Sequence, residues 1–325
     1  MEVQVLIGHN EVIYDATPII LEGLVWESNI TGSAGELRFS LKRDGITEFT
    51  EGDCVLFLVD GLLTFMGYVV SKERTSAQII SVVAYDQLFY MGKNIDSMVY
   101  WNQTATQILQ TLAEKHGFVM GDIADTEWII PQRIEAGQSI LDIIYSALDM
   151  TQKATGNEFF LYDVGGMLYL QNKTDLMVPV MLGYDGGISE YYYKTDISED
   201  TYNSVALYYT QDGEKQVVYV SNIPDKIEEW GGLQYVQSVE YGLNAAQMEL
   251  VATEILAEKG RVSKSLVVEN INGDYLLRAG YTIGMYIPDL AEIGIDGAVL
   301  IESCEHTFSD GMHKTKLTIR MEDVE

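Results

Sequence analysis

Two stretches of this chain, far apart in the sequence, carry the same β-strand pattern. After Gly52 the apolar residues Val55, Phe57 and Val59 fall at offsets of three, five and seven, and after Gly280 the residues Ile283, Met285 and Ile287 fall at the same offsets. Such alternation predicts half-buried strands. The four strands predicted in the first stretch are residues 36–41, 51–59, 67–70 and 78–83, and those in the second are 264–268, 279–287, 297–301 and 314–319.

This repeat predicts two similar β-barrel domains in one chain. Duplication matters because of symmetry: three copies of a chain with two barrels present six similar surfaces. A trimer of such chains would match a hexameric ring.

Composition restricts both the class of protein and its partners. With 325 residues, of which 47% are hydrophobic, the chain is expected to form two or three globular domains. Its formal net charge is −29, from 49 acidic and 20 basic residues, and the acidity is spread along the chain. Because such a chain repels phosphate backbones, we expect no specific binding to nucleic acid.

The two cysteines, Cys54 and Cys304, are too few for a disulfide framework. The first residues do not resemble a signal peptide, and no window approaches the length of a membrane span. We therefore expect synthesis in the bacterial cytoplasm, no membrane insertion, and release from the cell only by a route such as lysis.

The chain divides into three predicted regions, which make the fold mainly β with an α+β insertion. Residues 1–92 form the first β-barrel domain, and residues 93–180 form the inserted α+β module. That module has helices starting near Thr104 and Ser139 and a hairpin that turns at residues 163–166. Residues 181–325 contain further strands, one helix capped by Asn244, and the second β-barrel domain.

Two clusters invite a chemical interpretation. Glu228 and Glu229 beside Trp230 resemble a glycosidase site, although a solvated loop explains them more simply. His306 and His313 flank a predicted turn, so that with Cys304 they suggest a metal site whose third ligand is weak.

No strong catalytic motif accompanies these clusters. The chain lacks G-x-S-x-G, GxxxxGK[ST], GxGxxG and HExxH patterns, and we expect no cofactor, no metal and no catalytic residues. Its 21 tyrosines suit strand packing and subunit contacts, because tyrosine has an apolar body and a polar tip.

Several segments, taken in order, resemble a known family. They are residues 83–90, the helix from Thr104, residues 134–144, the hairpin of residues 160–168, and residues 299–317, which end the series with Gly311-Met-His. Together they are similar to baseplate hub proteins of contractile phage tails, and above all to those of defective prophages and R-type bacteriocins (tailocins), related to the late control protein D family.

The resemblance implies a structural protein rather than an enzyme. It implies a homotrimeric hub whose six barrels form a pseudo-sixfold ring between the hexameric tail tube protein and the central spike protein. Further implied partners are baseplate wedge or LysM-type adaptor proteins and a tape-measure protein. The particle would be a contractile injection system that carries this chain in its baseplate and is released by lysis.

The corresponding strand connections of the two barrels are expected to form the ring interface. The predicted contact residues are Asp60, Gly61, Leu62, Leu63, Leu290, Ala291, Glu292 and Ile293. Acidic residues facing the bore would keep DNA or a tape-measure protein from adhering. Two other functions remain open: a cell-wall glycan hydrolase, and a glycan-binding or receptor-binding protein at the tail tip.

Overall fold

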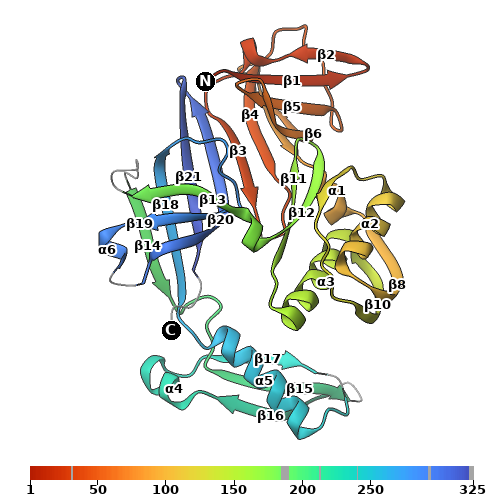
Figure 1. Ribbon diagram of the computed structural model, residues 1–325, viewed down its shortest axis with the longest axis vertical. Helices are drawn as coiled ribbons and strands as arrows, with labels where there is room; N and C mark the ends of the chain where they lie inside the picture. Colours follow the sequence, from red (N-terminus) through yellow and green to blue (C-terminus); the bar gives the residue numbers. More distant parts are fainter. Residues whose placement is uncertain (31, 184–189, 212–213, 240, 292–293, 322–325) are drawn as a thin grey trace. The chain divides into compact units, whose positions relative to one another are not determined.

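The computed structural model describes residues 1–30, 32–183, 190–211, 214–239, 241–291 and 294–321 (Figure 1). The chain divides into two compact units, one of Met1–Tyr191 with Val267–Glu325 and one of Tyr192–Leu266. The prediction of a mainly β fold is confirmed. None of the four sheets closes on itself through the described strands.

Most strands belong to one large sheet. Its strand order is β14-β18-β21-β20-β3-β4-β7-β6-β5-β1-β2, and β19 adds to it by pairing with β20 and with β13. The bounds are β1 (Val3–His9), β2 (Val12–Asp15), β3 (Leu24–Asn29), β4 (Glu36–Lys42), β5 (Cys54–Val59), β6 (Leu62–Arg74), β7 (Ile79–Tyr85), β13 (Met177–Gly183), β14 (Glu190–Asp196), β18 (Ser263–Asn272), β19 (Thr282–Tyr286), β20 (Asp296–Ser309) and β21 (Met312–Arg320).

Two sets of five strands within this sheet have the same order. The first β-group is β3-β4-β7-β6-β5, and the second β-group is β14-β18-β21-β20-β19. When the strands of a group are numbered by their place in the sheet from 1 to 5, successive strands along the chain occupy places 1, 2, 5, 4 and 3 in both groups. The repeated sequence pattern therefore corresponds to a repeated strand order.

The hydrogen bonds of the two β-groups also correspond. The amide of Gly52 donates to the carbonyl of Val69 (2.8 Å), and that of Gly280 donates to the carbonyl of Ile301 (2.9 Å). A register shift follows in each group, between Val69 and Ser71 of β6 and at the equivalent position of β20, between Ile301 and Ser303. A β-bulge at the same position is a specific feature, because a bulge bends and twists its strand.

The two groups differ outside these five strands. β1 pairs antiparallel with β5, whereas β13 pairs parallel with β19. The first two strands of the first group are joined by residues 30–35, whereas β14 and β18 are separated by residues 197–262.

β3 and β20 pair antiparallel and join the two β-groups (Figure 1). In this β3–β20 joint the ring of Trp26 stacks on the imidazole of His306, with centroids 4.7 Å apart. On the other face Glu27 and Glu305 lie opposite each other, and the guanidinium of Arg38 lies 3.5 Å and 3.2 Å from their carboxylates. A buried aromatic stack on one face and a shared cation on the other thus stabilise the joint.

The module between the two groups contains three helices, a two-stranded ribbon and a small sheet. Its core comes mainly from the helices, including Ile108, Leu109, Leu112, Ile140, Ile143 and Ile144. The bounds are α1 (Leu88–Lys93), β8 (Ile95–Gln103), α2 (Ala105–His116), β9 (Met120–Ile123), β10 (Ile130–Ser139), α3 (Ile140–Thr155), β11 (Phe159–Val164) and β12 (Met167–Asn172); 3-10 turns are η1 (Thr17–Ile19) and η2 (Lys173–Leu176).

The helix ends in this module follow the predicted signals. Thr104 caps α2 in a capping box with Gln107, and Ser139 caps α3 by accepting from the amide of Asp142. Both helices end at a glycine in the left-handed region, Gly117 and Gly156, which avoids the steric cost of a side chain there.

Unit two forms its own small sheet covered by one helix. The strand order is β16-β15-β17, and the core contains Val205, Leu207, Ala252 and Leu256. Its elements are β15 (Ser204–Gln211), β16 (Glu214–Asn222), α4 (Pro224–Trp230), β17 (Gln234–Ser238) and α5 (Ala245–Lys259). The remaining helix of the chain, α6 (Pro288–Ala291), belongs to unit one. Asn244 caps α5 as predicted.

The capping box gives a test of this local structure. Thr104→Ala removes the bond to the amide of Gln107, so we expect the free energy of unfolding to fall by about 1 kcal/mol. Thr111→Ala, within the same helix, is the matched control and should change it by much less. Urea denaturation measures both; equal losses would contradict the assigned cap.

Candidate functional site

A buried polar cluster, which we call the polar junction, connects the module to both β-groups. Its residues are Asp86, Gln87, Asp163 and Arg278, all of them buried. Asp86 accepts from the amides of Gly35 (2.8 Å) and Leu88 (2.9 Å), and thereby holds the β3–β4 connection at the start of α1.

Gln87 and Arg278 both donate hydrogen bonds to the β11–β12 hairpin. The side-chain amide of Gln87 donates to the carboxylate of Asp163 (2.7 Å), while its carbonyl accepts from the amide of Val119 (3.0 Å). The guanidinium of Arg278 donates to the backbone carbonyl of Asp163 (2.7 Å) and lies 4.4 Å from the ring centre of Tyr162. The second β-group therefore holds the hairpin directly.

Burial governs the electrostatics of the junction. It raises the pKa of Asp86 well above its ordinary value, with a further contribution from the nearby charge of Asp163. Burial also raises the pKa of Asp163 to about 6, against the opposing effects of Gln87, the amide of Gly166 and Arg278. Raised carboxyl pKa values mark functional sites, but structural networks produce them as well. The contacts described above tie the β3–β4 connection, α1, the β11–β12 hairpin and the segment before β19 to one another.

The predicted histidine pair is brought together within the β20–β21 hairpin. Nδ1 of His306 lies 2.9 Å from Nε2 of His313, and Nε2 of His306 lies 2.9 Å from the carbonyl of Leu277. Because that carbonyl only accepts, Nε2 of His306 carries the proton and Nδ1 accepts from His313. Burial lowers the pKa of His306 to about 3 and that of His313 to about 4.

Cys304 does not complete a metal site with these histidines. Its Sγ lies 3.1 Å from Nε2 of His306, whereas His313 contacts the opposite nitrogen, so the three groups do not face a common centre. Across the residues that the structure describes, no group of three or more His, Cys, Asp or Glu side chains is arranged to hold a metal ion.

The predicted glycosidase cluster lies at the end of α4. Nζ of Lys226 lies 2.8 Å from the carboxylate of Glu229 and 4.6 Å from the ring centre of Trp230. The hydrogen bond from Lys226 lowers the pKa of Glu229, which is the opposite of what a general acid requires. Glu228 is exposed on the same helix.

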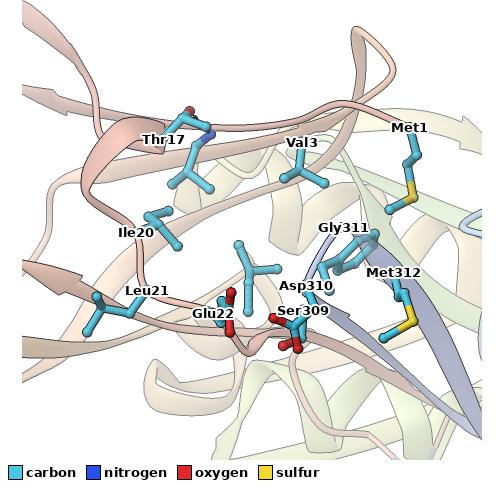
Figure 2. A pocket seen from close by; sticks show the side chains of 13 residues that line it. Met1, Val3, Thr17, Ile20, Leu21, Glu22, Ser309, Asp310, Gly311 and Met312 are labelled. Atoms are coloured by element: carbon cyan, nitrogen blue, oxygen red, sulfur yellow. Dashed lines mark hydrogen bonds between the residues drawn. The ribbon is translucent and has the colours of Figure 1, made fainter.

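A mainly apolar pocket lies between the N-terminal strand, the segment after β2 and the turn of the β20–β21 hairpin. Figure 2 shows Val3, Ile20 and Met312 among its lining residues, with Glu22 and Asp310 near one another. Its volume is about 200 Å³. A hydrogen bond from Asp310 raises the pKa of Glu22. Two carboxyls in direct hydrogen bond are closer than the roughly 5–10 Å that glycosidases use.

The predicted ring-interface residues lie in two different environments. Asp60 and Gly61 form the turn between β5 and β6 with φ values of 49° and 79°, typical of a type I′ hairpin. Leu62 is 56% exposed, and Leu63 is 40% exposed. Leu63 also lies close to Gly165 of the module, where an added Cβ would meet it at 3.3 Å.

The second set of predicted contact residues is less accessible. Leu290, in α6, is only 3% exposed, so its side chain packs within its own chain, and Ala291 is half-buried. Glu292 and Ile293 lie outside the described residues.

The sequence analysis missed an exposed apolar face on the β8–β10 ribbon. Val99 pairs with Ile134 and Trp101 pairs with Gln132, with the apolar members 48–67% exposed. No charged residue lies on this face between Ser97 and Trp101, where alternate residues point to solvent. The alternation of residues 95–101 was the available signal. Uncharged apolar faces of this kind are typical of contact surfaces.

Comparison with solved structures defines the class of fold. The chain is similar to the 43 kDa tail protein of prophage MuSo2 from Shewanella oneidensis, with a TM-score of 0.70, 13% identity and 98% of each chain covered. It is also similar to an Escherichia coli type VI secretion component, c3393, described as structurally similar to T4 tail proteins gp27 and gp5. There the TM-score is 0.57 at 12% identity, covering 94% of this chain and 74% of that one. The fold is therefore that of tail proteins.

Comparison by sequence gives the family. A family model described as YQBQ-like matches residues 24–320, and the chain belongs to this family. A curated relative is the phage-like element PBSX protein XkdQ of Bacillus subtilis, which is 30% identical over 273 residues, 83% of this chain and 82% of that protein. The predicted resemblance to prophage tail proteins is thereby confirmed. No helix within the described ranges is long and apolar enough to span a membrane.

The buried histidine pair predicts acid sensitivity. Because the pKa of His306 falls from about 6.5 to about 3 on folding, the unfolded chain binds more protons below pH 6.5. Stability is thus fully present above pH 6.5 and is lost as the pH falls toward 3, by about 1 kcal/mol per pH unit from His306 alone.

We expect His306→Gln to make the dependence of unfolding free energy on pH shallower between pH 6.5 and 4.5. Ile143→Val, in the core of the module, is the control: it should lower stability without changing that dependence. Urea titrations at several pH values measure both, and an unchanged slope in His306→Gln would contradict the assignment.

Proposed function

We propose that this protein is the structural baseplate hub of a contractile tail-like injection particle. It forms a homotrimer whose six β-groups make a pseudo-sixfold ring, which joins the hexameric tail tube to the central spike. The proposal takes the three regions of residues 1–92, 93–180 and 181–325 as first tube-like domain, inserted module and second tube-like domain. Its role is architectural, with no chemical reaction.

The repeated strand order, with its repeated bulge, carries this proposal. A trimer can match a sixfold partner only if each chain presents two equivalent surfaces, and the two β-groups share strand order, hydrogen bonds at Gly52 and Gly280, and a register shift. Each group is proposed to act as one β-barrel of the ring. The fold of prophage tail proteins and the relationship to XkdQ support the same function.

The remaining surfaces are assigned to other partners. The tube protein and the tape-measure protein meet the ring at its bore, and acidic residues there keep passing polymers from adhering. The wedge or LysM-type adaptor proteins attach at the periphery, where the uncharged face of β8 and β10 offers an apolar contact. The connections at residues 60–63 and 290–293 are proposed as ring contacts.

Molar mass is the direct test. Light scattering on the purified chain should give about 109 kDa, three copies of 36.4 kDa, and electron microscopy should show rings with six lobes around a central hole. If the isolated chain is monomeric, the same measurement is made on hub complexes released from intact particles. A dimer, or a ring with any number of copies other than three, would overturn the proposal.

A further inference from the structure

The β3–β20 joint connects the two β-groups through different strands. β20 is the fourth strand of the second group in chain order, and β3 is the first strand of the first group. β20 continues past its partner β19, and its second half pairs with β3 from Ser303 opposite Asn29 to Phe308 opposite Leu24. Its other edge is occupied by β21 from Leu300 to Ser309. The joint is therefore a head-to-tail contact between two equivalent units.

β6, the equivalent of β20, has the same free half-edge. Its ladder with β5 ends at Tyr68 opposite Cys54, and the main-chain bonds of Val69 to Gly52 and Asp53 are the last on this edge among the described residues. Beyond this point β7 covers one edge, from Ser71 opposite Val83 to Arg74 opposite Ile80. On the other edge, among the described residues, no strand pairs with Ser71–Arg74.

The loops beside the two edges also correspond, and Ser71, Glu73 and Arg74 of β6 are exposed. Phe49 lies three residues before Gly52, and Leu277 lies three residues before Gly280. The carbonyl of Phe49 accepts from Nζ of Lys72 (2.8 Å), and that of Leu277 contacts Sγ of Cys304 (3.7 Å) at the equivalent strand position. Because Leu277 does not prevent β3 from pairing with β20, Phe49 leaves room for a strand at β6.

β14 is the equivalent of β3, and among the described strands only β18 pairs with it. It is the end strand of the large sheet, with β18 as its neighbour, just as β3 has β4. Its sequence, Glu-Tyr-Tyr-Tyr-Lys-Thr-Asp, has strong β-propensity, and three consecutive tyrosines suit a contact between strands. Two acidic residues and one lysine in β14 complement Lys72, Glu73 and Arg74 of β6.

We propose that β14 of one copy pairs antiparallel with residues 71–74 of β6 in the next copy, and so repeats the β3–β20 joint between chains. This inference rests on the proposed trimer and names its contact. Both exposed strand edges are then satisfied by main-chain hydrogen bonds, the usual way in which edge strands bind a partner. Three chains contain three joints within chains and three between chains, and the ring closes.

Crosslinking tests the pairing in the full-length chain. Ser71→Cys with Thr195→Cys, the counterparts of the paired Ser303 and Asn29, in a Cys54→Ser background, places thiols on the two edges, where directly paired residues have Cα atoms about 5 Å apart. A short bismaleimide joins them by addition of each thiol across a maleimide double bond. We expect covalent dimers and trimers, the latter near 109 kDa, three copies of 36.4 kDa.

The matched control moves one cysteine to the opposite end of the sheet. Val12→Cys, in the exposed strand β2, replaces Ser71→Cys and should give no covalent oligomer with Thr195→Cys. Crosslinked products with Val12→Cys but not with Ser71→Cys, or a trimer by light scattering that cysteines at Ser71 and Thr195 cannot crosslink, would overturn the inference while leaving the proposed trimer intact. Absence of a trimer in solution and in particles would overturn both.

Hydrogen exchange supplies a measurement that needs no substitution. Amides of residues 70–75 and 190–196 in the wild-type chain should exchange at least tenfold more slowly in the trimer than in the diluted monomer, because new main-chain bonds protect them. Amides of β2 should exchange equally in both. Unchanged exchange at β6 and β14 would overturn the β14–β6 pairing, and protection of residues 60–63 alone would leave the strand connections as the ring contact.

Discussion

The β3–β20 joint is the interaction on which the architecture of unit one depends. Edge strands carry unpaired amides and carbonyls, and this joint satisfies two such edges at once. Its buried side is continuous with the interior of the first β-group, since Phe308 of β20 packs edge-on against Phe57 of β5, with ring centres 5.2 Å apart. The two β-groups therefore share apolar contacts as well as a ladder, and separating them would expose both.

The polar junction orients the module relative to this sheet. An apolar contact would allow the module to slide, because hydrophobic burial has no direction. Asp86 and Gln87 instead accept from and donate to backbone groups of three separate segments, which fixes one arrangement. Burying carboxyls opposes folding, and this cost is offset only while every partner stays in place.

Local signals in the sequence predicted local structure well. Thr104 and Ser139 mark helix starts because a side-chain oxygen three residues before a free amide is a short-range interaction. The offsets after Gly52 and Gly280 predicted the repeat because alternation reports which face of a strand is buried. The β3–β20 pairing was not predicted, since strand partners distant in the sequence leave no local signature.

Three further features of the structure were not predicted, because they too depend on contacts between distant parts of the sequence. Leu290 looks like a loop residue beside Pro288, yet a single helical turn points it into the core. The sequence attached no role to Asp86, because its amide partners on Gly35 and Leu88 become neighbours only in the folded chain. Exposure of Val99 and Ile134 likewise depends on which face of the ribbon the helices cover, and alternation alone does not decide that.

Unit two grows from the connection between β14 and β18, at the position where the first β-group has only residues 30–35. A connection tolerates long insertions because the entropy of closing a loop rises slowly with its length. The pairing of β14 with β18 does not depend on which residues the connection contains. The β14–β18 connection is thus an insertion site. Its inserted domain can be exchanged, lengthened or lost in evolution without loss of the sheet, and it is the first place in the chain at which to insert a foreign domain.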